Sequence, residues 1–278
     1  MINLHTIYIE GSYNTELNND TLKLSSLADK FVVIEEKIDG IDIGLSFDNN
    51  ANISIQTKSK IANVEQFSQL HTWANENTNK LWELIYDRYI LFGQWVYEKR
   101  SIFYNNLCAY LIETNIYDRK EDKFLSTYRR QDLISKTCGD LICSVPIIKI
   151  GRINTNENIK SYIMPSFYKT DEWKYNLKLC CDKYGYDFFN VMRETDDSTL
   201  MVGVNVKYES KDYILGQYTY MRKLFLDTGC RFGAIINNIL AGKWMFLSYE
   251  LKKYLGYDSD TKLYKWEYKI VDSEFEEI

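Results

Sequence analysis

The chain has 278 residues, of which 45% are hydrophobic and 26% are charged, and its formal net charge is -5 at pH 7. This length and apolar content suit one large domain, or one domain with a small appendage. The acidic balance argues against a protein that coats nucleic acid without regard to sequence, although it allows a local basic cleft. No window is apolar and long enough for a transmembrane helix, and the first residues, MINLHTIYIEGSYN, lack the pattern of a signal peptide. We therefore expect a cytoplasmic protein without membrane contact.

Histidine and cysteine usage narrows the possible chemistry. The chain has only two histidines, His5 and His71, and no CxxC pair, so a zinc site is poorly supplied with ligands. The scarcity of histidine also argues against a Ser-His-Asp triad. Free thiols in a reducing compartment are the expected state of the six cysteines, Cys108, Cys138, Cys143, Cys180, Cys181 and Cys230. Catalysis would have to rely on lysine, carboxylates or a bound metal.

The hydrophobic pattern predicts an α+β fold. In chain order it predicts strands over 31–47 and 52–57, a helix over 64–86 with a polar break at NENTN, and strands over 89–99 and 110–118. It then predicts a helix over 171–185, strands over 200–208 and 212–222, and a helix over 231–254. Asp48, Asn49 and Asn50 predict a turn between the first two strands, and Gly185 predicts the end of a helix. Because strands and helices do not alternate regularly, we expect a mostly antiparallel sheet flanked by helices.

A lysine interrupts the first predicted strand. Lys37-Ile38-Asp39-Gly40 follows the apolar residues of FVVI and precedes the alternating run IDIGLSF. The lysine is either a solvated charge at a strand end or a nucleophile held on a rigid strand end. On the tetrapeptide alone the solvated charge is the better interpretation. The sequence blocks around it, described next, favour the nucleophile.

Seven blocks together resemble one family. IEGS, EKIDG, LFGQWVYEKRSIFYNNL, IYDRKEDKFLS, VPIIKIG, VGVNVKYE and GQYTYMRKLF occur in the order seen in ATP-dependent RNA ligases of the covalent nucleotidyltransferase superfamily, over about residues 5–225. The resemblance implies a ligase-type nucleotidyltransferase domain over 1–225 and a small helical C-terminal appendage over 226–278. It implies ATP and Mg²⁺ or Mn²⁺ as cofactors, and broken or nicked RNA as the partner, with tRNA among the candidates.

The resemblance also assigns roles to residues. Lys37 would attack the α-phosphate of ATP, which requires an unprotonated amine, and burial together with nearby cations such as Lys207 would lower its pKa. Glu36, Ile38, Asp39, Gly40, Lys60, Gln94 and Arg222 would bind the nucleotide. Tyr218 and Tyr220 would stack on RNA bases, and Lys223 would contact RNA phosphates.

Several positions depart from the family pattern. The family has glutamates where this chain has Gln94 and Val202, an aromatic residue and an aspartate at Thr114 and Asn115, and a lysine at Thr219. Loss of one charge in a catalytic site typically costs about 2–4 kcal/mol of transition-state stabilisation. Charged residues that are close in sequence, and so offer compensation, are Glu194, Asp196, Asp197, Glu209 and Lys223.

Three functions therefore stay open. The first is an active RNA ligase that uses Lys37. The second is a ligase-fold protein that binds or protects RNA or nucleotide and has lost most catalysis. The third is a GTP-using mRNA capping enzyme, which shares KxDG, but such enzymes usually add an OB-fold domain that residues 225–278 are too short to supply. Segment 231–254 is interpreted as a helix on the core, with an RNA-docking or oligomer surface as the alternative.

Overall fold

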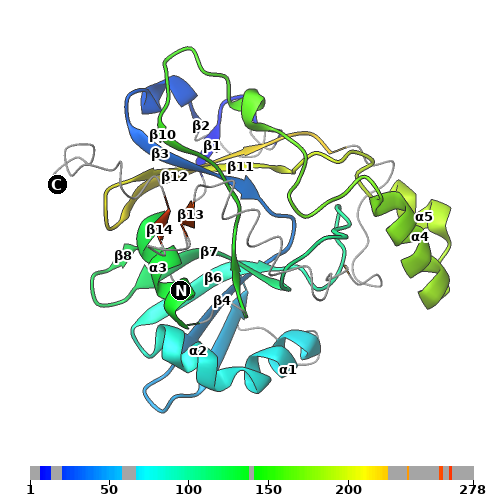
Figure 1. Cartoon of the computed structure of the whole chain (residues 1–278), viewed down its shortest axis with the longest axis horizontal. Helices are drawn as coiled ribbons and strands as arrows, with labels where there is room; N and C mark the ends of the chain where they lie inside the picture. Colours follow the sequence, from blue (N-terminus) through cyan, green and yellow to red (C-terminus); the bar gives the residue numbers. More distant parts are fainter. Residues whose placement is uncertain are drawn as a thin grey trace.

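The computed structural model describes residues 7–13, 21–57, 67–137, 141–224, 237, 257–258 and 263–264. Two sheets form the framework (Figure 1). The first has the order β10-β3-β11-β12-β1-β2, with β1 Ile7–Ile9, β2 Thr21–Leu22, β3 Phe31–Lys37, β10 Ile147–Arg152, β11 Gly203–Glu209 and β12 Ile214–Met221. The second has the order β5-β4-β6-β7-β8, and β9 pairs with β7; its strands are β4 Ile41–Phe47, β5 Ile53–Thr57, β6 Tyr89–Trp95, β7 Leu111–Asp118, β8 Lys123–Phe124 and β9 Cys143–Ser144.

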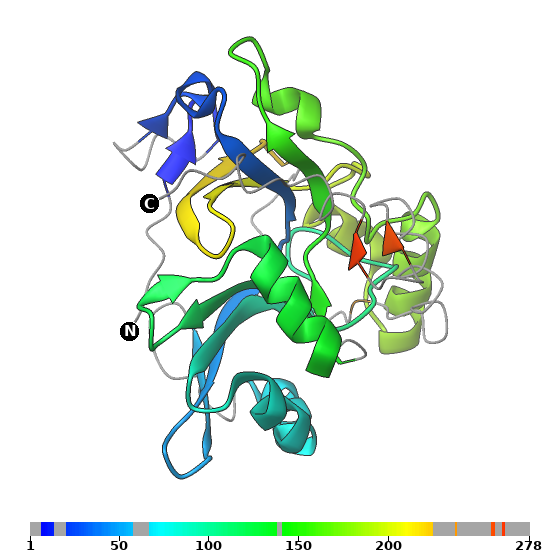
Figure 2. The same ribbon diagram turned by 60° about the vertical axis from the view of Figure 1, so that its left-hand side comes forward.

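Five α-helices are present in the described part of the chain: α1 Ser68–Glu76, α2 Thr78–Ile85, α3 Thr127–Thr137, α4 Trp173–Tyr184 and α5 Phe188–Arg193. Helices α1 and α2 cover the outer face of the second sheet, and α4 and α5 stand at one edge (Figure 1). In Figure 2, α3 lies between the two sheets. Most strand pairs are antiparallel, so the predicted α+β class is confirmed.

The predicted strand over 31–47 is two strands in different sheets. β3 ends at Lys37 in the first sheet, β4 begins at Ile41 in the second, and Ile38-Asp39-Gly40 connects them. The predicted hairpin is confirmed for β4 and β5: the Asp48 carboxylate accepts hydrogen bonds from the backbone N–H groups of Asn50 and Asn52, at 2.8 Å each. The lysine motif thus lies where the chain crosses from one sheet to the other.

The helix predictions agree with the structure where it can be compared. The helix over 64–86 is broken at Asn77, between α1 and α2, and α4 ends at Gly185 in the left-handed conformation that glycine favours. Helices α3 and α5 and strand β10 were not predicted. Within the described residues no helix is long and apolar enough to span a membrane.

Two clusters of buried apolar side chains pack on the sheets, one on each sheet. The first packs α1 and α2 on the second sheet and includes Leu45, Leu81 and Ile85. The second lies on the face of the first sheet that carries Val32, Ile34, Val204, Val206 and Tyr220. A third cluster lies at the crossing point and contains Ile38, Val96, Ile112, Tyr104 and Val202.

The C-terminal part is described at only a few positions. Tyr257–Asp258 and Leu263–Tyr264 form a small antiparallel pair, β13 and β14, and Asn237 is buried against the end of β6. The rest of the predicted helix over 231–254 lies outside the described residues, so the domain boundary at 225 stays a prediction.

The expectation of free thiols is wrong for one cysteine pair. Cys108 and Cys143 form a disulfide, because the parallel pairing of β9 with β7 brings Cys143 beside Ile112, close to Cys108. Cys180 and Cys181 are thiols outside the disulfide and are buried in the interface between α4 and its neighbours. Cys138 and Cys230 lie outside the described residues.

Candidate active site

Lys37 is the last residue of β3 and shares a strand face with several charged groups. β3 and β11 are antiparallel, with Lys37 opposite Gly203, Glu35 opposite Asn205 and Val33 opposite Lys207. Since alternate residues of a strand point to one face, Lys37, Glu35 and Lys207 share a face, whereas Glu36 lies on the other. Lys37 is half-buried, and its Nζ makes neither a hydrogen bond nor an ion pair with any residue that the structure describes.

The loop after Lys37 is held by the segment that follows β6. The backbone N–H of Ile102 donates to Asp39 Oδ2 at 3.0 Å, and the backbone N–H of Asp39 donates to the Tyr104 hydroxyl at 2.8 Å. Arg100 Nη1 donates to the Gly40 carbonyl at 2.8 Å. Burial raises the pKa of Asp39, while Arg100 opposes this rise. These contacts fix the backbone directly after the candidate nucleophile.

Gly40 is required by a close approach between strands. A Cβ at this position would lie 2.8 Å from Val96 Cγ1, 2.9 Å from Gln94 Cβ and 3.0 Å from the Trp95 carbonyl. Contacts that short force a shift of neighbouring atoms, one of which belongs to the backbone of β6. The glycine of the motif therefore permits the crossing between the sheets.

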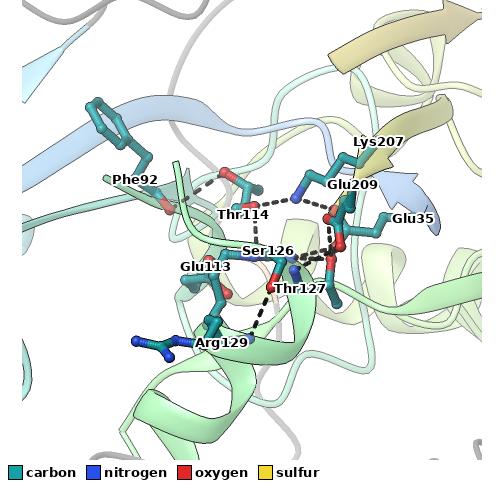
Figure 3. A network of polar contacts seen from close by, with 10 residues as sticks. Glu35, Phe92, Glu113, Thr114, Ser126, Thr127, Arg129, Lys207 and Glu209 are labelled. Carbon is teal, nitrogen blue, oxygen red and sulfur yellow. Dashed lines mark hydrogen bonds and ion pairs between the residues drawn. The ribbon is translucent and has the colours of Figure 1, made fainter. Parts of the chain in front are cut away.

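A buried charge network lies on the same strand face (Figure 3). It begins at Glu35, two residues before Lys37, and extends along β3 and β11 away from the crossing loop. We define it by six residues: Glu35 on β3, Glu113 on β7, Thr127 and Arg130 on α3, and Lys207 and Glu209 on β11. All six are buried. Lys207 Nζ is 2.6 Å from Glu35 Oε2, Arg130 Nη1 is 2.6 Å from Glu113 Oε1, and Arg130 Nη2 pairs with Glu35 Oε1.

Glu209 connects the first sheet to the beginning of α3. Thr127, the first residue of α3, donates its backbone N–H to Glu209 Oε2 at 2.9 Å and its hydroxyl to Glu209 Oε1 at 2.7 Å. A carboxylate at a helix N-terminus satisfies orphan N–H groups and interacts favourably with the helix dipole. Burial nevertheless raises the pKa of Glu209 to about 7. Burial, with the neighbouring Arg130, lowers the pKa of Lys207.

Thr114 is the point at which the network reaches the second sheet. The register of β6 and β7 shifts between Phe92 and Gly93, which pair with Asn115 and Glu113, so Thr114 is a bulge residue outside the ladder. Its carbonyl accepts a hydrogen bond from Lys207 Nζ at 2.6 Å and another from Arg130 Nη1. In Figure 3 the Lys207 side chain extends from the first sheet to this carbonyl. The position where the family places an aromatic residue is therefore a bridge between the sheets.

The structure places the remaining predicted residues as follows. Gln94 Nε2 donates to Asp42 beside the crossing loop, and Ile38 packs in the apolar cluster there. Lys60 lies outside the described residues. Gly203 of β11 lies opposite Lys37, and Lys207 is four residues further along that strand. At the usual rise per residue this places the backbone of Lys207 about 13 Å from that of Gly203. Its expected role in lowering the pKa of Lys37 stays a prediction.

Glu36 points away from Lys37. Its carboxylate accepts hydrogen bonds from the Ser166 hydroxyl at 2.6 Å and from the Phe167 backbone N–H at 3.2 Å. Burial raises the pKa of Glu36 to about 7. In this position it anchors the 166–168 segment on the other face of the sheet.

The residues predicted around the end of β12 have mainly internal contacts. Arg222 pairs with the Asp196 carboxylate and donates to the Met201 carbonyl at 2.7 Å, so it holds the segment that leads into β11. Tyr220 is buried in the apolar cluster of the first sheet, so its ring is not accessible for stacking on a base. Tyr218 is partly buried against the same cluster, and its base-stacking role stays a prediction. Lys223 is exposed, and its RNA contact stays a prediction.

The departures from the family pattern are built into the packing. Val202 lies in the apolar cluster with Ile38 and Ile112, and the Thr219 hydroxyl donates to Asn205 Oδ1 at 2.7 Å. Of the four carboxylates that offered compensation, Asp196 is bonded to Arg222, Glu209 to Thr127 and Asp197 to Lys174. A role for any of them beside Lys37 stays a prediction.

The described residues do not form a metal site of their own. No group of three or more histidine, cysteine, aspartate or glutamate side chains among them is arranged to hold an ion. Glu35 and Glu113 are paired with the cations of the buried charge network. The expected use of Mg²⁺ or Mn²⁺ therefore stays a prediction.

Sequence reasoning missed Arg130, Glu113 and Thr127 altogether. The helix that carries Arg130 reads TYRRQDLISKT, and its inward face includes charged and hydroxyl side chains in place of an apolar stripe. The family-like block IYDRKEDKFLS, which directly precedes this helix, was the one sequence signal that pointed to a functional segment here.

Comparison with known proteins gives one family and one set of structures. A family model described as RNA ligase matches residues 30–207, more than half of the chain. Three solved structures of Naegleria gruberi RNA ligase are similar: a mutant with AMP and Mn (12% identity, 80% of this chain and 56% of that chain, TM-score 0.49), another mutant with ATP and Mn (14%, 80% and 59%, 0.46), and the ligase with PPi (14%, 80% and 60%, 0.45). No curated protein matches the sequence. The chain thus spans less than two thirds of the length of these ligases.

Proposed function

The chain belongs to the RNA ligase family, and from this premise we propose that it is an ATP-dependent RNA ligase that forms a lysyl-AMP intermediate at Lys37 and joins broken RNA. The observation that carries the proposal is the state of Lys37. It is a half-buried lysine without an ion pair to any described residue, at the end of a central strand, followed by a loop held at Asp39 and Gly40. A nucleophile must have an available amine and a fixed position, and this residue has both.

In the proposed first step, the unprotonated Nζ of Lys37 attacks the α-phosphorus of ATP. A nitrogen–phosphorus bond forms, the bond from that phosphorus to the bridging oxygen breaks, pyrophosphate leaves, and the amine proton passes to solvent. In the second step an oxygen of an RNA 5′-phosphate attacks the same phosphorus, which breaks the nitrogen–phosphorus bond and frees Lys37. The RNA 3′-hydroxyl then displaces AMP and seals the ends.

The chain supplies positioning and charge for these steps. Asp39, Arg100 and Tyr104 fix the loop next to Lys37, so its amine approaches the α-phosphate from a constant direction. On the same face, Glu35 and Lys207 are buried and paired with each other, so they fix the two strands beside Lys37. A divalent ion at this site would be held largely by the substrate phosphates, as is common for Mg²⁺ in proteins.

A second candidate is a ligase-fold protein that binds RNA or nucleotide with little or no catalysis. The observation that favours it is Val202, which stands in an apolar cluster where the family has a glutamate. A carboxylate there would be buried among apolar side chains, so the cluster is adapted to the valine. Slow lysine labelling together with retained RNA binding would support this candidate.

Covalent labelling tests the proposal directly. The full chain is incubated with α-labelled ATP and Mg²⁺ or Mn²⁺, and we expect acid-labile label on Lys37 that pyrophosphate removes. Lys37→Ala should lose all label. Lys30→Ala is the matched control, since Lys30 directly precedes β3 and its Nζ stacks 4.3 Å from the centre of the Tyr208 ring, away from the loop.

Two outcomes would contradict the ligase proposal. Wild-type protein that takes no label with either metal would leave the binding candidate. Label from GTP in preference to ATP would favour a capping-type guanylyltransferase. Label on Lys37 followed by end joining of a nicked RNA would support the proposal, because it reports both lysine adenylylation and the later transfer and sealing steps.

A further inference from the structure

The segment between β6 and β7 is buried but lies outside the sheet. Residues 96–110 have few ladder hydrogen bonds, although Ile102, Phe103 and Tyr104 are almost completely buried. Buried backbone N–H and carbonyl groups need partners, and an irregular segment must find them in side chains or distant parts of the chain. The hydrogen-bond partners of the backbone groups in residues 96–110 therefore determine how firmly this segment is held.

Asn237 supplies several of these partners from the C-terminal part of the chain. Its Nδ2 donates to the Val96 carbonyl at 3.0 Å, its backbone N–H donates to the Tyr97 carbonyl at 3.0 Å, and its Oδ1 accepts from the Tyr104 backbone N–H at 2.9 Å. The Tyr110 hydroxyl donates to its carbonyl at 3.4 Å. Asn237 is 1% exposed, so its bonds are shielded from water.

The same segment holds the loop that follows Lys37. Tyr104 receives the Asn237 contact on its backbone N–H and the Asp39 contact on its hydroxyl, and it is 1% exposed. A buried tyrosine ring is rigid, so a contact that fixes its backbone also fixes the hydroxyl at the end of the ring. Asn237 and Asp39 are thus connected through one residue.

We infer that Asn237 is a positioning residue for the Lys37 loop and acts through Tyr104. Its effect on catalysis rests on the proposed function. The contact joins the part of the chain beyond residue 225, expected from the sequence to be a separate appendage, to the backbone next to the candidate nucleophile. The family-matched segment, residues 30–207, does not include Asn237 and so lacks this contact.

The test is a double-mutant cycle in the full chain with three variants: Asn237→Ala, Tyr104→Phe and both together. Each single change should lower the rate of Lys37 labelling at saturating ATP by about tenfold to a hundredfold, because small displacements of a reacting group have effects of that size. The KM for ATP should change little. The double variant should be no slower than the slower single variant, since both act on one contact chain.

Asn105→Ala is the matched control. Asn105 lies in the same segment, but its side chain bonds to Thr170, with Nδ2 2.6 Å from Thr170 Oγ1 and Oδ1 2.9 Å from the Thr170 nitrogen. This variant should lose a comparable pair of hydrogen bonds and keep its labelling rate. Tyr104→Phe removes only a hydroxyl, so it serves if Asn237→Ala fails to fold.

A second readout separates this inference from the proposed function. Amide hydrogen exchange of a peptide that covers residues 37–41 reports the Asp39 N–H bond whether or not the protein takes label. Asn237→Ala should speed exchange at Asp39, and Asn105→Ala should leave it unchanged. Unchanged exchange in Asn237→Ala, or strictly additive effects on labelling, would overturn the inference.

Discussion

β3 and β11 present two lysines on one face, and their surroundings are opposite. Lys37, at the crossing between the sheets, is half-buried, and its Nζ has no ion pair within the described chain. Lys207, at the other end, is fully buried and bonded to Glu35 and the Thr114 carbonyl. The same residue type is thus left available at one end and fully engaged at the other.

The difference follows from what covers each end. Helix α3 and the β7 bulge close the Lys207 end and bring carboxylates and an arginine into a fully buried space. The Lys37 end is bordered by the apolar cluster of Ile38, Ile112 and Val202, and the charge recorded as interacting with the lysine there is Asp39. Buried charges need partners, so the groups at the Lys207 end are tied to one another, whereas the proposed chemistry requires the amine at the Lys37 end.

Removal of the arginine between the carboxylates should have the largest effect on stability. Arg130→Met takes the cation from Glu113 and Glu35 while keeping an apolar stem, and we expect a loss of about 3–5 kcal/mol in the free energy of unfolding, measured with urea at pH 8. At low pH the stranded carboxyls can take up protons, so the loss should be smaller there.

Arg129→Met is the control for this prediction. Arg129 is the preceding residue of α3 and pairs at 3.3 Å with Asp212, with both side chains close to half exposed. Its loss should cost about 1 kcal/mol or less. Equal costs for the two variants would show that the buried charge network contributes no more than a surface pair.

Glu209 should give the protein a pH dependence of intermediate size. Its pKa is raised from 4.5 to about 7, so the folded state binds a proton more tightly than the unfolded state does. The stabilisation by this group is fully present below pH 4.5 and is lost as the pH rises to about 7, with a slope of up to about 1.4 kcal/mol per pH unit.

Urea unfolding at pH 5, 6, 7 and 8 measures this dependence, and Glu209→Gln should flatten the profile. Glu36 contributes in the same direction, because its pKa is also raised to about 7. A Glu36→Gln variant separates the two groups. If stability instead rises from pH 5 to pH 8 in the wild-type protein, the direction assigned to both carboxyls is wrong.

The sequence predicted the Lys37 end better than the Lys207 end, for a physical reason. A lysine within an apolar run and a following glycine are local signals, and the structure places both at the sheet crossing. That β3 and β4 belong to different sheets was not predictable, because alternation looks the same in either sheet. The crossing depends on contacts of Gly40 and Asp39 with residues 94–104, which are far away in the sequence.

The buried charge network was hidden for a related reason. Glu35 and Lys207 lie in predicted strands, but their pairing follows from the β3–β11 register, which periodicity does not determine. Arg130 lies on a helix whose inward face combines Thr127 and Arg130 with the apolar Ile134, so α3 produced no clear amphipathic signal. Buried ion pairs break the pattern from which elements are predicted.

The smallest expected effect on stability is at Lys37. Lys37 is half-buried and its recorded interaction is the charge interaction with Asp39, so Lys37→Met should change the free energy of unfolding by less than about 0.5 kcal/mol, the usual range for substitutions that break no buried contact. Lys207→Met removes donors from Glu35 and from the Thr114 carbonyl, so it should cost clearly more. Urea unfolding of both variants under one condition makes the comparison. A loss at Lys37 as large as that at Lys207 would mean that the lysine at the crossing is held as firmly as its buried counterpart, and the availability on which the proposed chemistry depends would be gone.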